Sequence, residues 1–285
     1  MKRLYGVPGT NASLSTYFPK NQYGAFLIRY TGTAAVGVTV TRANLGTVQF
    51  TWNGKDIINV DAEILNLADN LYGGVSEFTS AVGGAFACSV IIPCGQWIDA
   101  ANVYDVGIND KVALNLSFPD LASAAVVVSA TVEVYYKTKT GVMNYLNNII
   151  KRNVVMTGAG NFSDNYPISN VAQLFIKNPA ALLSNIQVSK DNNTIVDCSP
   201  AVALSYNDYL HLVETTGTTL AIEFGESKDI RENVGGQVNY SYTFSGAGTL
   251  QQYLCYLTFT SQSKVLSSRA QAAQDLTSKI SAANS

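Results

Sequence analysis

The chain has 285 residues, a length that suits one large β domain or two domains of ordinary size. Only 13% of the residues are charged, against roughly 25% in an average soluble protein, while 47% are hydrophobic. The net charge is −2, and the sequence has no basic block that could bind phosphates, so we do not expect direct nucleic-acid binding. Sparse charge fits an ordinary weakly charged β domain, and it equally fits a protein whose outer surface contacts other protein chains.

The start of the chain and its apolar stretches indicate where in the cell the protein is made. Residues 1–9 include Lys2 and Arg3 but no apolar run, so they do not form a secretory signal. The longest apolar stretch, 122–132, has about half of the roughly 20 residues that a membrane-spanning helix needs. We therefore expect synthesis in a cytoplasm.

In chain order, residues 1–22 lack periodicity and are expected to form an extended N-terminal arm. The turn Asn53-Gly54 between apolar runs is a hairpin signal. Asp61 is expected to cap a short helix with an apolar face at Ile64 and Leu67. Alternating or apolar runs predict strands over 23–31, 35–42, 46–52, 86–92, 111–118 and 124–137.

The segment 141–152 differs from the strands before it. Val142, Leu146, Ile149 and Ile150 have helical spacing, which predicts a linker helix packed across a domain junction.

The second half of the chain shows a similar succession of predicted strands and a short helix. Ser199-Pro200 is a strong helix start, with serine as the cap and proline in the first position. Strands are predicted over 171–177, 185–189, 219–224, 237–244 and 250–260. Residues 263–285 are predicted to form a C-terminal helix with a weakly apolar stripe at Leu266, Ala270, Ala273, Leu276 and Ile280.

The two halves match in element order. Val132, Val134 and Tyr136 alternate with polar residues, as do Cys255, Leu257 and Phe259 at an offset of 125 residues. Val112 matches Val238, Leu27 matches Phe175, Val48 matches Ile186 and Ile92 matches Ile222, at offsets of 126, 148, 138 and 130 residues. The pattern predicts a duplicated all-β unit, with the first copy over 23–140 and the second over 153–262.

No catalytic, cofactor-binding or metal-ligating set is predicted. GxSxG, HExxH and P-loop motifs are absent, and the single histidine, His211, has no nucleophile motif near it. The four cysteines, Cys88, Cys94, Cys198 and Cys255, are expected to be buried free thiols. Loose acidic groups could hold Ca²⁺ but are more simply solvated loop charges: Asp99, Asp105 and Asp110, and Glu226, Asp229 and Glu232. Trp52 and Trp97 are expected to be core or interface anchors rather than a sugar platform.

The expected fold is all-β, two tandem jelly-roll sandwiches with a linker helix and a C-terminal helix. On its repeat order and paired terminal strands, 130–137 and 255–260, residues 23–262 resemble the double jelly-roll major capsid proteins of tailless, membrane-containing icosahedral bacteriophages. The resemblance implies a coat protein without enzymatic activity, located in the virion after synthesis in the host cytoplasm. It implies a homotrimer with a pseudo-hexagonal outline that meets neighbouring capsomers, penton or minor capsid proteins and an internal lipid membrane.

In this reading the contacts between copies involve 4–18, the linker helix and the stripe over 266–280. Other classes remain open. A phage tail or receptor-binding β-sandwich protein that recognises host glycans would share the composition. A carbohydrate-active enzyme would need paired loop carboxylates. An outer-membrane β-barrel would suit the aromatic alternation, but the expected lack of a signal sequence argues against it.

Overall fold

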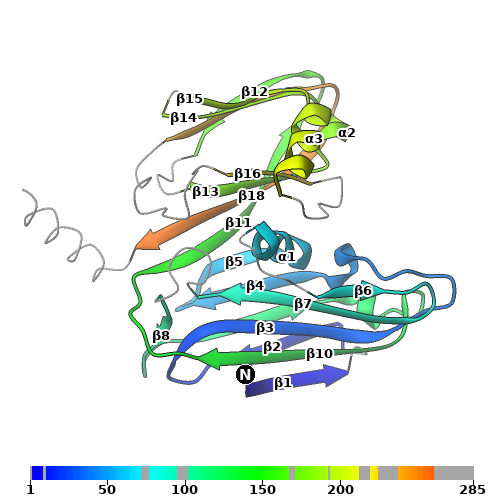
Figure 1. Cartoon of the computed structure of the whole chain (residues 1–285), viewed down its shortest axis with the longest axis vertical. Coiled ribbons are helices and arrows are strands. Elements are labelled where there is room, and N and C mark those ends of the chain that lie inside the picture. Colours follow the sequence, from blue (N-terminus) through cyan, green and yellow to red (C-terminus); the bar gives the residue numbers. More distant parts are fainter. Residues whose placement is uncertain are drawn as a thin grey trace, which may run out of the picture.

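The computed structural model describes residues 2–8, 11–71, 77–94, 102–166, 171–191, 193–211, 219–223 and 237–259. Two β-sandwiches lie one above the other, and we call the lower one in Figure 1 module 1 and the upper one module 2. Module 1 contains β1 to β10 with helix α1. Module 2 contains β11 to β18 with helices α2 and α3.

Module 1 consists of two facing sheets. One has the strand order β1-β10-β3-β7-β6, with β8 also paired to β3, and the other has the order β2-β9-β4-β5. The bounds are β1 Lys2–Pro8, β2 Ser13–Tyr17, β3 Asn21–Ala34, β4 Thr47–Trp52, β5 Lys55–Asp61, α1 Ala62–Leu71, β6 Phe78–Ser80, β7 Ala85–Pro93, β8 Tyr104–Val106, β9 Val112–Ser117 and β10 Val127–Thr138, with 3-10 turns at Arg42–Leu45 and Pro119–Ala122.

Module 2 also has two sheets, with strand orders β11-β18-β13-β16 and β12-β17-β14-β15. The bounds are β11 Tyr145–Met156, β12 Gly160–Asn165, β13 Val171–Lys177, α2 Pro179–Leu182, β14 Leu183–Lys190, β15 Asn193–Cys198, α3 Pro200–His211, β16 Thr219–Glu223, β17 Val238–Phe244 and β18 Gly248–Phe259.

The two modules repeat each other strand by strand. Strands β1 to β5 correspond in order and neighbours to β11 to β15, α1 corresponds to α3, and β7, β9 and β10 correspond to β16, β17 and β18. Each set of eight strands forms two sheets of four, which is the jelly-roll arrangement. The predicted all-β fold of two tandem jelly rolls is therefore confirmed.

Alternation builds each core. In β17, Val238, Tyr240, Tyr242 and Phe244 are buried while the residues between them are partly exposed, so one side of the strand faces the sandwich interior. The predicted helix starts are also confirmed, since α1 begins directly after Asp61 and α3 begins at Pro200.

The register corrects one part of the predicted repeat. Strand β3 pairs Leu27 with Tyr135, and its equivalent β13 pairs Phe175 with Tyr253, so β10 and β18 are related by 118 residues rather than 125. The odd shift of seven residues exchanges the two faces of the strand. The predicted match to Cys255 and Leu257 is therefore wrong, and Cys255 packs in the hydrophobic cluster of module 1.

The predicted linker helix over 141–152 is wrong, because strand β11 starts at Tyr145. Ile149 is buried in the cluster of module 1, while Ile150 packs against that of module 2. A strand with apolar neighbours on both faces gives a continuous apolar run that periodicity alone cannot distinguish from a buried helix. Pairing with β18 along its whole length decides the outcome.

Three further expectations from the sequence are not met by the described structure or lie outside it. The arm predicted over 1–22 is not separate from module 1, because its described residues 2–8 and 13–17 form β1 and β2, which join opposite sheets of module 1. The strand predicted over 35–42 is wrong, since this segment makes a turn and leads into the 3-10 turn that starts at Arg42. The C-terminal helix over 263–285 lies outside the described residues.

Candidate functional site

The junction between the modules is built on one strand pair. Strands β5 and β11 run parallel, with Ile58 opposite Ile149 and Asn59 opposite Ile150. This pair joins a sheet of module 1 to a sheet of module 2, giving eight strands in the order β16-β13-β18-β11-β5-β4-β9-β2 (Figure 1). Backbone hydrogen bonds therefore cross from one jelly roll to the other.

A cluster of charges lies beside this strand pair. Asp61, at the end of β5, accepts a hydrogen bond from the Tyr253 hydroxyl at 2.5 Å and lies 3.4 Å from Lys151 Nζ and 3.6 Å from Lys177 Nζ. Lys177 also forms an ion pair with Glu63 in the first turn of α1. Burial disfavours the charged form of Lys177, but the two carboxylates outweigh it and raise its pKa above the ordinary value.

Apolar burial accompanies the charges. Phe175, Ala221, Tyr253 and Cys255 lie on the outer face of the β13–β18 sheet, yet all are buried in the same cluster as the core of module 1. The junction is consequently a continuation of the hydrophobic core rather than a polar contact between two finished domains.

The entry into β11 is also fastened to module 1. The Asn102 side chain accepts hydrogen bonds from the backbone N–H groups of Asn144 and Tyr145 at 2.7 and 3.2 Å and donates to the Tyr145 carbonyl at 3.1 Å. The Tyr104 hydroxyl accepts a hydrogen bond from Asn147 N at 3.0 Å. Both anchoring residues are buried, so these bonds fix where β11 begins.

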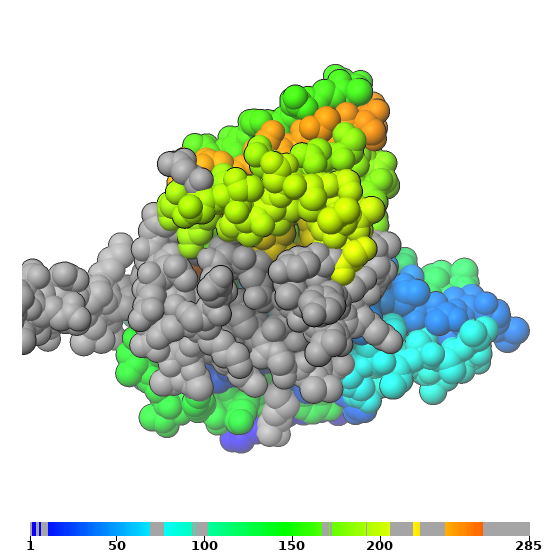
Figure 2. All heavy atoms as spheres, turned by 45° about the horizontal axis from the view of Figure 1, so that its top comes forward, coloured from blue at the N-terminus to red at the C-terminus, as the bar shows by residue number. Residues whose placement is uncertain are grey.

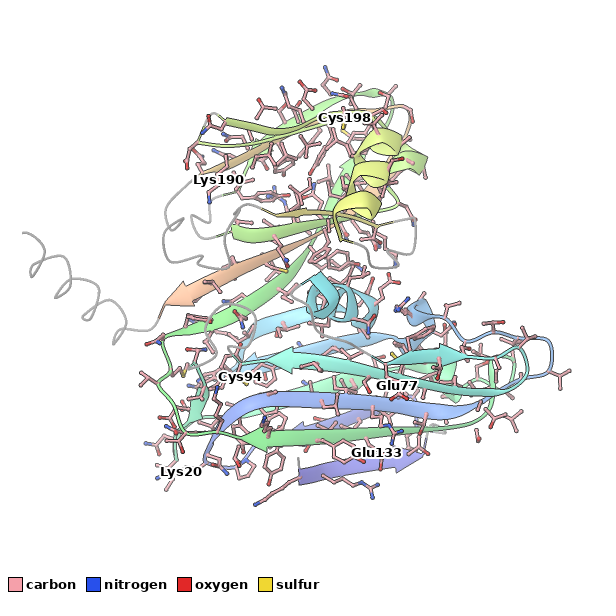
Figure 3. All side chains as sticks on the ribbon, viewed as in Figure 1. Lys20, Glu77, Cys94, Glu133, Lys190 and Cys198 are labelled. Carbon is pink, nitrogen blue, oxygen red and sulfur yellow. The ribbon has the colours of Figure 1, made fainter. Side chains whose placement is uncertain are left out.

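The outer face of the β1-β10-β3-β7 sheet carries charged and tyrosine side chains like those of the junction, but they are more exposed. Arg3 Nε lies 3.1 Å from Glu133 Oε1, and the Tyr135 hydroxyl donates a hydrogen bond of 2.9 Å to Glu133 Oε2. The hydrogen bond to Glu133 raises the pKa of Tyr135. Figure 3 shows Glu133 on this lower sheet, away from module 2.

The outer faces of the other two sheets are polar and nearly uncharged. In module 1, a row of hydrogen-bonded side chains crosses the sheet: Ser15 to Asn115 at 2.6 Å, Asn115 to Gln49 at 3.1 Å, and Gln49 to Asp56 at 2.9 Å. A similar row in module 2 contains Ser163, Ser241, Gln187 and Asp197, with bonds of 2.8 Å between the serines and 3.3 Å from Gln187 to Asp197.

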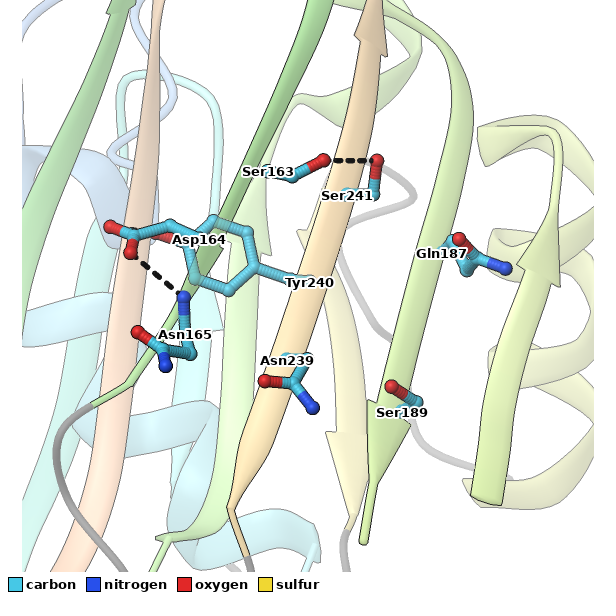
Figure 4. Close-up of a pocket in the computed structure, with 8 residues that line it drawn as sticks. All are labelled: Ser163, Asp164, Asn165, Gln187, Ser189, Asn239, Tyr240 and Ser241. Carbon is cyan, nitrogen blue, oxygen red and sulfur yellow. Dashed lines mark hydrogen bonds between the residues drawn. The ribbon is translucent and has the colours of Figure 1, made fainter. Parts of the chain in front are cut away.

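A shallow hollow of about 390 Å³ lies on this face of module 2 (Figure 4). Asp164 is its one carboxylate, and it forms an ion pair of 2.5 Å with Arg152. Backbone donation from Asn165 and the bond from Arg152 lower the pKa of Asp164. The lining residues are Ser163, Asp164, Asn165, Gln187, Ser189, Asn239, Tyr240 and Ser241. A single carboxylate already paired with a cation is not an acid–base couple.

The predicted acidic groups do not assemble in the described part of the chain. Asp105 accepts a hydrogen bond from Gln22, and Asp110 accepts bonds from Asn53 and from Gly107 N that lower its pKa. No group of three His, Cys, Asp or Glu side chains among the described residues could hold a metal ion. The other acidic residues named for Ca²⁺, Asp99, Glu226, Asp229 and Glu232, lie outside the described residues.

The cysteines and Trp52 pack among hydrophobic side chains. Cys88, Cys94 and Cys255 are free and buried, while Cys198 is half-buried beside α3 (Figure 3). Burial raises the pKa of Cys88 to about 12, which makes it an inert thiol. Trp52 packs edge-on against Tyr104, with ring centroids 5.9 Å apart. Trp97 and the side chain of His211 lie outside the described residues.

Sequence reasoning named Asp61 only as a helix cap and missed its role at the junction. The partners Lys151, Lys177 and Tyr253 follow it by 90 to 192 residues, so no local motif could connect them. One signal was present: at the offset of 148 that relates β3 to β13, Lys177 corresponds to Arg29, which repeats a basic residue on the same face. No described helix is long and apolar enough to cross a bilayer.

No family model and no curated protein matches the chain. Solved structures do match. The major capsid protein P2 of bacteriophage PM2 aligns with a TM-score of 0.58 and 17% identity, over 92% of this chain and 96% of that one. The capsid of virus PBCV-1 aligns with a TM-score of 0.55 and 9% identity, over 90% and 92%. The shared feature is the fold.

Proposed function

We propose that this chain is a major capsid protein that forms trimers of pseudo-hexagonal outline and assembles an icosahedral virion shell. One observation carries the proposal. The paired jelly rolls occupy nearly the whole chain, and nearly the whole of the PM2 protein P2 has the same arrangement. A likeness that covers 92% of this chain and 96% of that one supports a role that lies in the fold itself.

The chemistry of the described residues supports a structural role over an enzymatic one. Titratable side chains are paired at the junction or hydrogen-bonded in loops rather than gathered in a cleft. Apart from Asp56 and Asp197, the polar rows on the sheet faces carry amides and hydroxyls, which make directional contacts without a desolvation cost as large as that of charges. Such faces suit the sides of a building block.

Three copies with two similar modules each supply six similar corners, which is the basis of the pseudo-hexagonal outline. Blocks of this outline cannot fill the five-fold vertices of a closed icosahedral shell, so a separate penton protein is needed there. Neighbouring capsomers, minor capsid proteins and an internal lipid membrane are further proposed partners, with the virion as the location and the host cytoplasm as the place of synthesis.

The experiment is size-exclusion chromatography with light scattering, followed by negative-stain microscopy of the purified chain. We expect a trimer at micromolar concentration and particles with six-fold outlines. A well-behaved monomer across the micromolar range, with no particles, would contradict the proposal.

The alternative, a tail or receptor-binding protein that recognises glycans, is favoured by the hollow in Figure 4, because its amides and hydroxyls suit a hydroxyl-rich ligand. A glycan array separates the two proposals. Specific binding that Gln187→Ala abolishes, in a protein that stays monomeric, would favour this alternative.

A further inference from the structure

We propose that copies of the chain join head to tail by repeating the junction between their own two modules. In this contact, β15 and α3 of one copy lie against β1 and the outer face of the β1-β10-β3-β7 sheet of the next. The inference rests on the proposed function and names the surfaces that meet. The template is inside the chain, where β5 and α1 meet β11 and the outer face of its sheet.

The edges that the template would use are open in one copy. Strand β15 corresponds to β5, and β1 corresponds to β11. In the described structure, β15 pairs only with β14 and β1 pairs only with β10. The two strands lie at opposite ends of the molecule, β15 at the top and β1 at the bottom of Figure 1. Unpaired edges of this kind are templates for strand addition.

The register of the template selects complementary charges. Asn59 of β5 corresponds to Asp197 of β15, because each lies opposite the glutamine of the polar row. Ile150 of β11 corresponds to Lys2 of β1, through their partners Leu254 and Tyr136. Repeating the Asn59–Ile150 pair between copies therefore places Asp197 beside Lys2, and both residues are exposed in a single chain.

Burial differs between equivalent positions as the inference requires. Ile57 of β5 is 7% exposed, whereas its equivalent Ile195 of β15 is 41% exposed. Ile64 of α1 is fully buried, whereas its equivalent Val202 of α3 is 58% exposed. In Figure 2 the region around α3 forms the near surface of module 2. The second module thus presents uncovered the apolar side chains that the first module buries.

The receiving surface repeats as well. Lys151 and Lys177, which face Asp61 at the junction, correspond to Arg3 and Arg29 on the outer face of module 1. The buried Phe175 and Tyr253 correspond to Leu27 and Tyr135, which are only partly buried.

One difference separates the two junctions. The positions of Asp61 and Glu63 are taken by Ser199 and Ala201 in module 2, so the contact between copies lacks the carboxylates of the internal one. We therefore expect a weaker contact than the internal junction. A head-to-tail contact closes into a ring when its rotation divides a full turn. A rotation of one sixth of a turn from each module to the next would give three copies a six-part ring.

Cross-linking tests the pairing directly. On a Cys198→Ser background, Lys2→Cys and Asp197→Cys are combined in one chain and treated with a short bismaleimide. We expect covalent dimers and trimers, each single variant giving none. The matched control combines Asn59→Cys with Ile150→Cys, which we expect to link within one chain, adding the mass of one linker and forming no covalent dimer.

Light scattering shows whether the double variant still forms trimers. If it does, and the bismaleimide gives no covalent dimers or trimers while the control variant is linked, the inference is wrong and the proposed function stands. Failure of the unmodified chain to form trimers would instead count against the proposed function.

A second variant tests the apolar patch. Val202→Asp is expected to weaken trimer formation by on the order of tenfold, because a buried carboxylate would face the next copy. Val36→Asp is the control, since Val36 is 95% exposed in the turn after the end of β3 and is not one of the residues assigned to the contact. Equal trimer formation by the two variants would contradict the assignment of α3 to the contact.

Discussion

Gly46 and Gly54 share a positive φ of 78° but have different surroundings. A Cβ on Gly54 would meet open space, whereas a Cβ on Gly46 would lie 1.9 Å from the carbonyl oxygen of Ser117. We expect Gly54→Ala to lower the free energy of unfolding by about 1 kcal/mol through backbone strain alone. Gly46→Ala adds displacement of a strand, at about 2 kcal/mol or more.

Urea denaturation of the two glycine variants measures the difference. Both proteins contain the same substitution at a glycine of the same positive φ, so the two variants are compared with each other. Equal midpoints would mean that β9 shifts freely to admit the new methyl group.

Asp164 links strand β12 to Arg152 of β11, and its pKa is lowered in the folded protein. A carboxyl with a lowered folded-state pKa contributes stability that is present above its unfolded pKa near 3.8 and is lost as pH falls through the folded value. We therefore expect the wild type to be more stable than Asp164→Asn at neutral pH. The difference should vanish in acid, as measured by urea midpoints from pH 7 to pH 2. Parallel curves over that range would contradict this role.

At the scale of elements, the junction depends on Lys177 of β13. Its removal leaves the carboxylate of Glu63, which is largely buried, without its cation. We expect Lys177→Met to lower the free energy of unfolding by about 1–3 kcal/mol, a value below that of a fully buried pair because Lys177 is partly exposed. Lys55→Met, at an exposed position in β5, is the control. A loss no larger than that of the control would show that the charges at the junction are screened by solvent.

Elements with one buried face could be predicted from the sequence, and those with two could not. Strand β17 alternates buried and partly exposed residues, and α1 and α3 begin directly after Asp61 and Ser199, the residues expected to cap them. Strand β11 carries apolar side chains on both faces, because one face belongs to each module. Its helix-like spacing is a product of tertiary contacts that local periodicity does not record.

The prediction of the register of β18 was wrong for the same reason. Tyr253 and Cys255 face module 1, while Leu254 faces the core of module 2, so both sets of positions are apolar. The choice between them needed the pairing with β13. The surfaces proposed for assembly likewise depend on residues brought together by register rather than by sequence spacing.

For the whole molecule, self-association predicts a dependence on concentration. Copies that bind the folded chain and not the unfolded chain stabilise it by mass action. We expect the thermal midpoint of the wild type to rise across a hundredfold range of protein concentration. The midpoint of Val202→Asp should rise less. Midpoints that do not move with concentration would contradict assembly through folded surfaces.

The segment from 139 to 144 is the covalent connection between the modules, while β11 beyond it is held by β18 on one side and β5 on the other. A protease that severs this connection would leave the paired strands, the Asp61 charges and the shared core in place. The two fragments would stay together as a nicked protein, and halves expressed from separate genes would complement each other. Either half produced alone would display a bare strand edge beside apolar side chains, and would precipitate.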